Sequence, residues 1–238
     1  MFEIYRSTVM TRGRRLLPLT LGLGLTGLFG VIEYKRGFGP GSGPDPFMML
    51  PILYAIVVGS GVIAADVRDG SAALLLTRSV SRTGYLAGRF LGTLTVSAAG
   101  CAAMYAVPAV MAAARGMSGR PGVLAAQALT ALASVIWVSA VLLFFSTFLP
   151  SHGDVLAALG IVVTAHSLLD IVRYAGLTAL IRFVPHVTEN IFNTLFIYDF
   201  SWHPALLSDL LRWSSNIAVM LTAAALAFRQ REFSYAGE

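Results

Sequence analysis

The sequence predicts an all-α integral membrane protein with six transmembrane helices. Of its 238 residues, 56% are hydrophobic and only 12% are charged, whereas soluble domains carry about 25% charged residues. The mean hydropathy is +0.74. Most of the surface must therefore face a solvent other than water. Apolar runs close to the roughly 20 residues that one helical crossing needs indicate that this solvent is a lipid bilayer.

Six apolar segments can be placed along the chain, and each is predicted to cross the bilayer as a helix. They run from Leu16 to Ile32, Phe47 to Ala65, Phe90 to Ala114, Val123 to Leu149, Val155 to Val172 and Trp213 to Phe228, the last with an alternative start near Leu206. In the second segment, Gly59-Ser60-Gly61 is interpreted as small residues that let helices pack closely. No separate soluble domain is predicted, so residues 1–238 form one transmembrane domain.

Two segments outside the spans are predicted to lie along the membrane surface. In the arm of residues 1–15, apolar side chains recur at helical spacing opposite two arginines, which predicts an interfacial helix. The apolar positions are Phe2, Tyr5, Val9 and Met10, and the arginines are Arg6 and Arg12. Residues 173–205 mix aromatic and charged side chains, a composition typical of short amphipathic helices at the outer interface. Residues 37–46 are rich in Gly and Pro and predict an outer loop.

The positive charges predict the orientation. With six spans, ten of the 17 Lys and Arg residues fall on the side that holds both termini and the 66–89 loop, and seven fall on the other side. Loops rich in Lys and Arg face the cytoplasm, so both termini and the 66–89 loop are predicted to be cytoplasmic. The net charge of +5 does not indicate nucleic-acid binding, because the arginines lie at the ends of apolar runs, where they orient the spans.

The sequence excludes nucleotide hydrolysis by a P-loop. That motif requires Gly-x-x-x-x-Gly-Lys-Ser/Thr, in which the lysine reaches the phosphates. The chain has one lysine, Lys35, which lies between Tyr34 and Arg36. An ATPase would therefore have to be a separate polypeptide.

One pair of ionisable residues lies at membrane depth. His166 and Asp170 are four positions apart in the fifth segment, so they share a helix face. Such a pair can form a proton or metal site, line a polar substrate path, or make a local hydrogen bond near the outer interface. Two ligands are too few for a closed zinc site, so no metal is predicted. A membrane enzyme with its site at this pair is one alternative function.

The 66–89 loop carries the most specific pattern. An amphipathic helix there would present the apolar patch Leu74, Leu75 and Leu76 between Asp69-Gly70 and Arg78. The loop then reads Ser79-Val80-Ser81-Arg82 and enters the third segment with Tyr85-Leu86-Ala87-Gly88-Arg89. This order resembles the first cytoplasmic loop of type-2 ATP-binding-cassette (ABC) exporter permeases. In that family an acidic-Gly-Thr element precedes a Leu-rich turn, a Pro-Val-Ser-Arg element and a Tyr-Leu-x-Gly-Lys entry. Here Ser71, Ser79 and Arg89 replace the Thr, Pro and Lys.

The resemblance implies a permease subunit in a bacterial-type inner membrane. The loop would be a coupling helix that docks on a separate ATPase, through Asp69, Gly70, Leu74, Leu75, Leu76, Arg78, Ser79, Val80, Ser81 and Arg82. Residues 1–15 would be an elbow helix, and 173–205 would hold short gate helices. Two permease chains, identical or different, would work with two ATPase chains, which would bind the ATP and Mg. The chain itself would not be an enzyme. A non-transporting membrane anchor that binds the same ATPase is a second alternative function.

Overall fold

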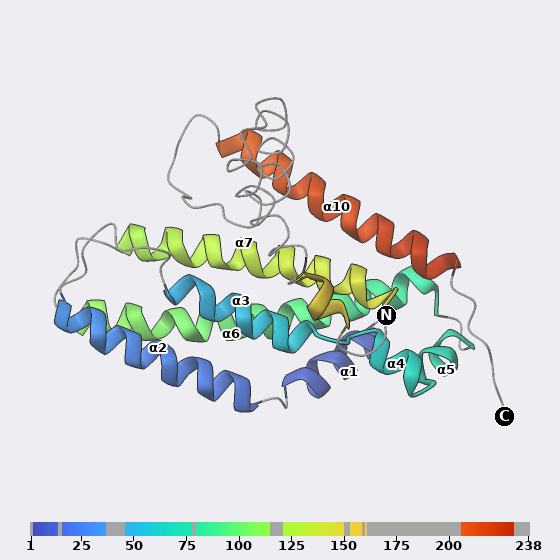
Figure 1. The fold of residues 1–238 in the computed structure, drawn as a ribbon, viewed down its shortest axis with the longest axis horizontal. Helices are drawn as coiled ribbons and strands as arrows, with labels where there is room; N and C mark the ends of the chain where they lie inside the picture. Colours follow the sequence, from blue (N-terminus) through green and yellow to red (C-terminus); the bar gives the residue numbers. More distant parts are fainter. Residues whose placement is uncertain are drawn as a thin grey trace, which may run out of the picture. The chain divides into compact units, whose positions relative to one another are not determined.

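The described part of the chain is built from helices. The computed structural model describes residues 2–13, 16–36, 46–77, 80–114, 121–149, 153–158, 160 and 206–230. Within these ranges the labelled elements are α1 Phe2–Gly13, α2 Leu16–Arg36, α3 Pro46–Gly59, α4 Ala64–Arg68, α5 Ser71–Thr77, α6 Arg82–Ala114, α7 Pro121–Ser146 and α10 Leu206–Gln230 (Figure 1). Residues 153–158 are also helical. The all-α fold class is confirmed for these residues.

Four stretches of the chain, one of them made of most of α3 together with α4, are long and apolar enough to cross a membrane. They are Leu50–Arg68, Arg82–Val107, Ala125–Ser146 and Leu207–Gln230, and they coincide with the second, third, fourth and sixth predicted spans. The first predicted span falls on α2, whose apolar part, Pro18–Leu28, is shorter. Most of the fifth lies outside the described residues. The total of six spans therefore stays a prediction.

The helices belong to two compact units. The first contains the chain up to Gly59 together with Gly88–Ser139, and the second contains Ser60–Ala87 with, among the described residues, 140–160 and 206–230. In the first unit Tyr54 and Val58 of α3 pack with Val96 and Met104 of α6 to form a buried cluster. Leucines of α2 and Val9 of α1 pack against this cluster. The apolar faces of α1, α2, α3 and α6 thus share one core.

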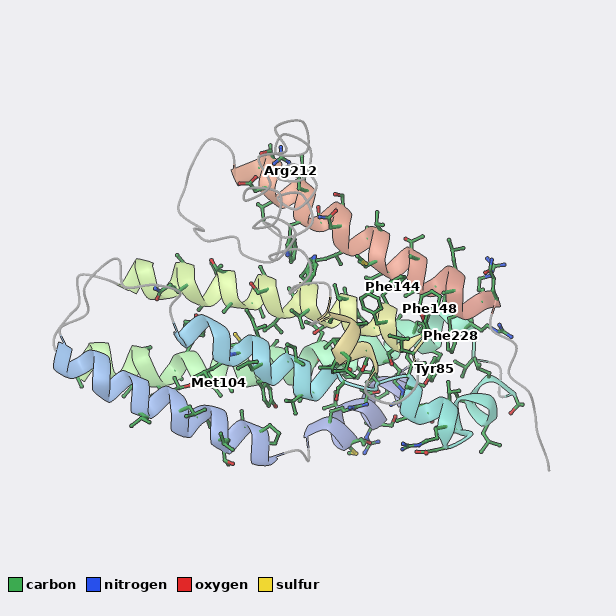
Figure 2. The ribbon with its side chains drawn as sticks, viewed as in Figure 1. Tyr85, Met104, Phe144, Phe148, Arg212 and Phe228 are labelled. Carbon is green, nitrogen blue, oxygen red and sulfur yellow. The ribbon has the colours of Figure 1, made fainter. Side chains whose placement is uncertain are left out.

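Glycines allow two of these helices close to α6. A Cβ atom built on Gly100 would lie 2.1 Å from Cε1 of Tyr54, and one built on Gly22 would lie 2.2 Å from the terminal methyl of Met104. Real side chains never approach so closely, so a glycine is needed for α3 to reach α6 at Gly100. Met104, labelled in Figure 2, fills the space beside Gly22 on α2.

The second predicted span is broken, which corrects the interpretation of Gly59-Ser60-Gly61. The helix ends at Gly59 and resumes at Ala64, and Gly61 adopts a positive φ of 62°. Glycine reaches that conformation at little cost because it has no Cβ. The sequence predicted packing positions within a continuous helix, but the structure uses Gly61 to turn the chain between α3 and α4.

The second unit satisfies the backbone groups that this break leaves unbonded. The N–H of Gly61 donates to Oδ2 of Asp154 at 2.7 Å, and the N–H groups of Ile63 and Ala64 both donate to Oγ of Ser146, at 2.9 and 3.2 Å. Asp154 and Ser146 are both 0% exposed. Irregular backbone at membrane depth is tolerated where other groups restore its hydrogen bonds, and these two side chains do so.

Candidate functional site

The 66–89 loop consists of two short helices followed by the start of α6. Gly70 has a φ of 71° and separates α4 from α5, and the N–H of Asp69 still bonds to the carbonyl of Ala65 at 2.9 Å. The Asp69-Gly70 element is therefore a helix-ending turn, where glycine takes the left-handed conformation. The ion pair between Arg68 and Asp69 is exposed, at 3.2 Å, and such pairs contribute little to stability.

Helix α5 exposes part of the predicted apolar patch. Leu74 is 69% exposed, whereas Leu75 and Leu76 are half-buried. Ala72 is fully buried and lies on the side of the helix that faces the protein. The described part of the loop therefore presents one large apolar side chain, Leu74, to its surroundings. Arg78 and Ser79 lie outside the described residues.

Ser81 marks the start of α6. Its Oγ accepts a hydrogen bond from the N–H of Gly84 at 3.1 Å, and its carbonyl accepts one from the N–H of Tyr85 at 2.9 Å. This is the geometry of a helix N-cap, in which a serine hydroxyl satisfies an N–H of the first turn. Val80, just before it, is half-buried. Ser81 of the motif thus has a structural role in starting α6.

Arg82 binds the end of α10. Its Nη1 donates to the carbonyl oxygens of Phe228 and Arg229 at 3.2 and 2.6 Å. These carbonyls belong to the last turn of α10, where no following N–H is available within the helix. The guanidinium supplies donors and a positive charge at the negative end of the helix dipole.

Tyr85 joins two further elements to α6. Its hydroxyl donates a hydrogen bond to Oδ2 of Asp66 on α4. Its ring stacks on Phe228 of α10, with a centroid distance of 5.4 Å and an interplanar angle of 9° (Figure 2). Both rings are 0% exposed. The pairing of Phe228 with Tyr85 is a tertiary contact between distant parts of the chain, so the sequence pattern around either residue does not predict it.

Helix α1 is confirmed as a helix, but Arg12 lies on a different face from the one predicted. Arg12 is 6% exposed, and its Nη1 donates to the carbonyl of Val58 at the end of α3 at 3.0 Å. Arg89 donates to Oγ1 of Thr8 at 2.8 Å, which connects α1 to α6. Phe2 and Met10 are 73% and 51% exposed, as an interfacial helix would leave them. The buried face of α1 could have been predicted from the four-residue spacing of Ile4, Thr8 and Arg12.

A glycine sets the distance between α1 and α6, which gives a testable prediction. A Cβ on Gly92 would lie 2.6 Å from Cβ of Thr8 and 3.2 Å from the carbonyl oxygen of Tyr5. Gly92→Leu should therefore displace α1 and raise the hydrogen-exchange rate of its amides. Gly27→Leu is the matched control, because a Cβ on Gly27 would meet nothing within 4 Å. Unchanged exchange in α1 of Gly92→Leu would contradict the prediction.

The His166 and Asp170 pair and the 173–205 segment lie outside the described residues. Among the residues that are described, no group of three or more His, Cys, Asp or Glu side chains could hold a metal ion.

Four helical stretches long and apolar enough to span a membrane, with a short-helix loop between the second and third predicted spans, indicate a multi-pass helical membrane protein. The family model for the ABC-2 family transporter protein matches residues 25–230, which is most of the chain. The chain therefore belongs to the ABC-2 transporter family, which confirms the family that the sequence resemblance predicted. Its family makes it a membrane transport subunit that works with an ABC ATPase. No curated protein matches the chain.

Proposed function

We propose that the chain is the permease subunit of an ATP-driven exporter, and that its 66–89 loop is the docking site for a separate ABC ATPase. The single observation that carries the proposal is α5, a short helix that exposes Leu74 in the same loop as the exposed ion pair of Arg68 and Asp69. An exposed apolar side chain rimmed by charged groups is typical of a protein-binding surface. The absence of a P-loop lysine supports an ATPase on another chain.

The proposed mechanism is alternating access. Two ATPase chains bind ATP and Mg, and closure of their dimer moves the docked loop. The movement passes from residues 69–82 into the second and third spans of two permease chains, identical or different. ATP can drive export in this way only if the closed ATPase dimer binds the outward-open permease more tightly than the inward-open one. In this arrangement the loop and both termini are on the cytoplasmic side of an inner membrane.

The loop residues have different proposed roles. Leu74, with Leu75 and Leu76 beside it, fills the groove on the ATPase, and Asp69 and Arg78 contact the rim. Gly70 and Ser81 set the ends of the flanking helices, which is supported by the φ of Gly70 and the hydrogen bond from Gly84 to Ser81. Arg82 positions α10 through its carbonyl contacts. Reversing its charge would disturb the permease itself, so Leu74 is the better probe of docking.

The test is co-purification of the tagged permease with its ABC ATPase. Leu74→Glu should weaken the association about tenfold or more, because burying a leucine contributes roughly 1.5–3 kcal/mol and 1.4 kcal/mol corresponds to a tenfold change. Leu74→Met is the matched control, since it keeps an apolar side chain of similar volume, and should bind as the wild type does. Equal recovery of the ATPase with Leu74→Glu and with Leu74→Met would refute the proposed docking site.

A further inference from the structure

Four side chains of the second unit connect α4, the start of α6 and the end of α10. Asp66 of α4 accepts a hydrogen bond from Tyr85 of α6, and Tyr85 stacks on Phe228 of α10. Arg82, at the first position of α6, donates to the carbonyls of Phe228 and Arg229. We call Asp66, Arg82, Tyr85 and Phe228 the α10 junction. It joins the loop to a helix that follows it by more than a hundred positions, as the separations of 146 and 147 residues between Arg82 and its acceptors show.

The position of Arg82 is unfavourable for its own helix. A positive charge in the first turn of a helix is repelled by the positive end of the helix dipole. The first turn of α6 also holds no acidic residue that would offset this charge. The same guanidinium is favourable at the C-terminal end of α10, where the carbonyls carry partial negative charge. The placement of Arg82 is therefore explained by α10.

Helix α10 has few other buried positions. Only 6% of its spanning window is buried, compared with 44–67% for the other three candidate spans. Its buried residues among those described are Ala224 and Phe228, which lie one turn apart near the C-terminal end. Exposed leucines and a valine lie along the rest of the helix. The burial of α10 is thus concentrated at the junction.

We propose that movement of the 66–89 loop is transmitted directly to α10, in addition to the two spans that the loop joins. This rests on the proposed function, in which an ATPase docks on the loop. When α4 and α5 move, Tyr85 carries the motion from Asp66 to Phe228 through a hydrogen bond and a ring stack, and Arg82 carries it to the last-turn carbonyls. The four residues are positioning residues: they hold the sixth predicted span in register with the loop.

The test follows α10 in the complete complex. The permease with Cys101→Ser and Ser215→Cys, whose site on α10 is exposed, is spin-labelled and reconstituted with its ATPase in phosphatidylethanolamine and phosphatidylglycerol vesicles. The label spectrum is recorded without nucleotide and after trapping with ATP and vanadate, and ATPase association is measured on the same samples. We expect the wild-type label to shift on trapping. Arg82→Met should bind the ATPase and lose this shift.

Conservative variants distinguish the transmission of movement from the loop to α10 from a general loss of permease stability. Arg82→Lys keeps a donor and a charge and should retain part of the shift, whereas Tyr85→Phe keeps the stack but loses the bond to Asp66 and should reduce the shift. Both keep most of the volume of the original side chain, so they decide the question if Arg82→Met does not fold. Arg229→Met is the matched charge control, because that side chain is exposed, and it should respond as the wild type does.

The outcomes distinguish the two proposals. A wild-type label that does not shift although the ATPase is bound overturns the role of α10 and leaves the docking site standing. Full shifts in Arg82→Met, Arg82→Lys and Tyr85→Phe also overturn it. Failure of the ATPase to bind the wild-type permease overturns the docking proposal, and the role of α10 falls with it.

Discussion

Asp154→Ala should destabilise the folded chain by about 2 kcal/mol, because it leaves the N–H of Gly61 without its acceptor. Oδ2 of Asp154 lies 2.7 Å from that nitrogen, and Oδ1 accepts the N–H of Val155 at 2.9 Å. The side chain is 0% exposed, so water does not replace it in the folded structure. A buried donor that is left without an acceptor costs about 1–3 kcal/mol.

Ser146→Ala should have a comparable effect at the same break. The single Oγ of Ser146 accepts the N–H groups of both Ile63 and Ala64, the first groups of α4. These N–H groups have no acceptor within their own helix, because an α-helix leaves its first four donors without partners. Without the hydroxyl, α4 would lose the acceptor at its start, and the loop that follows it would be less firmly held.

Heating the detergent-solubilised protein and measuring the monodisperse fraction by size-exclusion chromatography checks both variants. Asp154→Asn is the first control, because it keeps an acceptor oxygen and should lose less than alanine does. Ser215→Ala is the second, since this exposed hydroxyl on α10 donates only to the carbonyl of Arg212 among the bonds described. If Asp154→Ala and Asp154→Asn lose their monodisperse fraction at the same temperature as the wild type, the break between α3 and α4 does not depend on this carboxylate.

The broken span shows why sequence alone predicted the helices but not their interruption. The apolar run from Phe47 to Ala65 has the length of one crossing, and Gly-Ser-Gly occurs in packed helices as well as in turns. The turn forms because Asp154 and Ser146 supply acceptors for its N–H groups. These residues are 93 and 83 positions from their donors, Gly61 and Ile63. Local patterns do not reveal such pairs.

The sequence predicted where the 66–89 loop lies and that it exposes an apolar side chain. It did not predict which of its residues make contacts within the chain. The exposed Leu74 follows from the pattern of apolar residues among charged ones, and α5 forms there. Arg82 was assigned to a partner surface by the resemblance of the loop to the permease family. Its contact with α10 depends on where another helix ends, and that is a tertiary property. Tyr85 and Arg89 belong to the same motif, yet they bind Asp66 and Thr8 within the chain.

Gly100→Val should be the most damaging of the helix-packing substitutions, because it forces α3 away from α6. A Cβ at this position would lie 2.1, 2.6 and 2.8 Å from three ring atoms of Tyr54. That ring is 6% exposed and belongs to the buried cluster with Val58, Val96 and Met104. A stiff aromatic ring in a packed core has no nearby space, and overpacking of this kind costs typically about 1–3 kcal/mol. The expected result is a markedly lower inactivation temperature in detergent.

A graded series of alanine substitutions tests this cause specifically. Gly22→Ala also meets a neighbour at 2.2 Å, but that atom is the terminal methyl of Met104, and methionine adapts because its side chain is flexible. Gly27→Ala meets nothing within 4 Å, and alanine favours a helix over glycine by roughly 0.5–1 kcal/mol. Stability should therefore fall in the order Gly27→Ala, Gly22→Ala, Gly100→Ala. Equal stability of Gly100→Ala and Gly27→Ala would mean that Tyr54 moves freely, and that the contact at Gly100 does not hold α3 against α6.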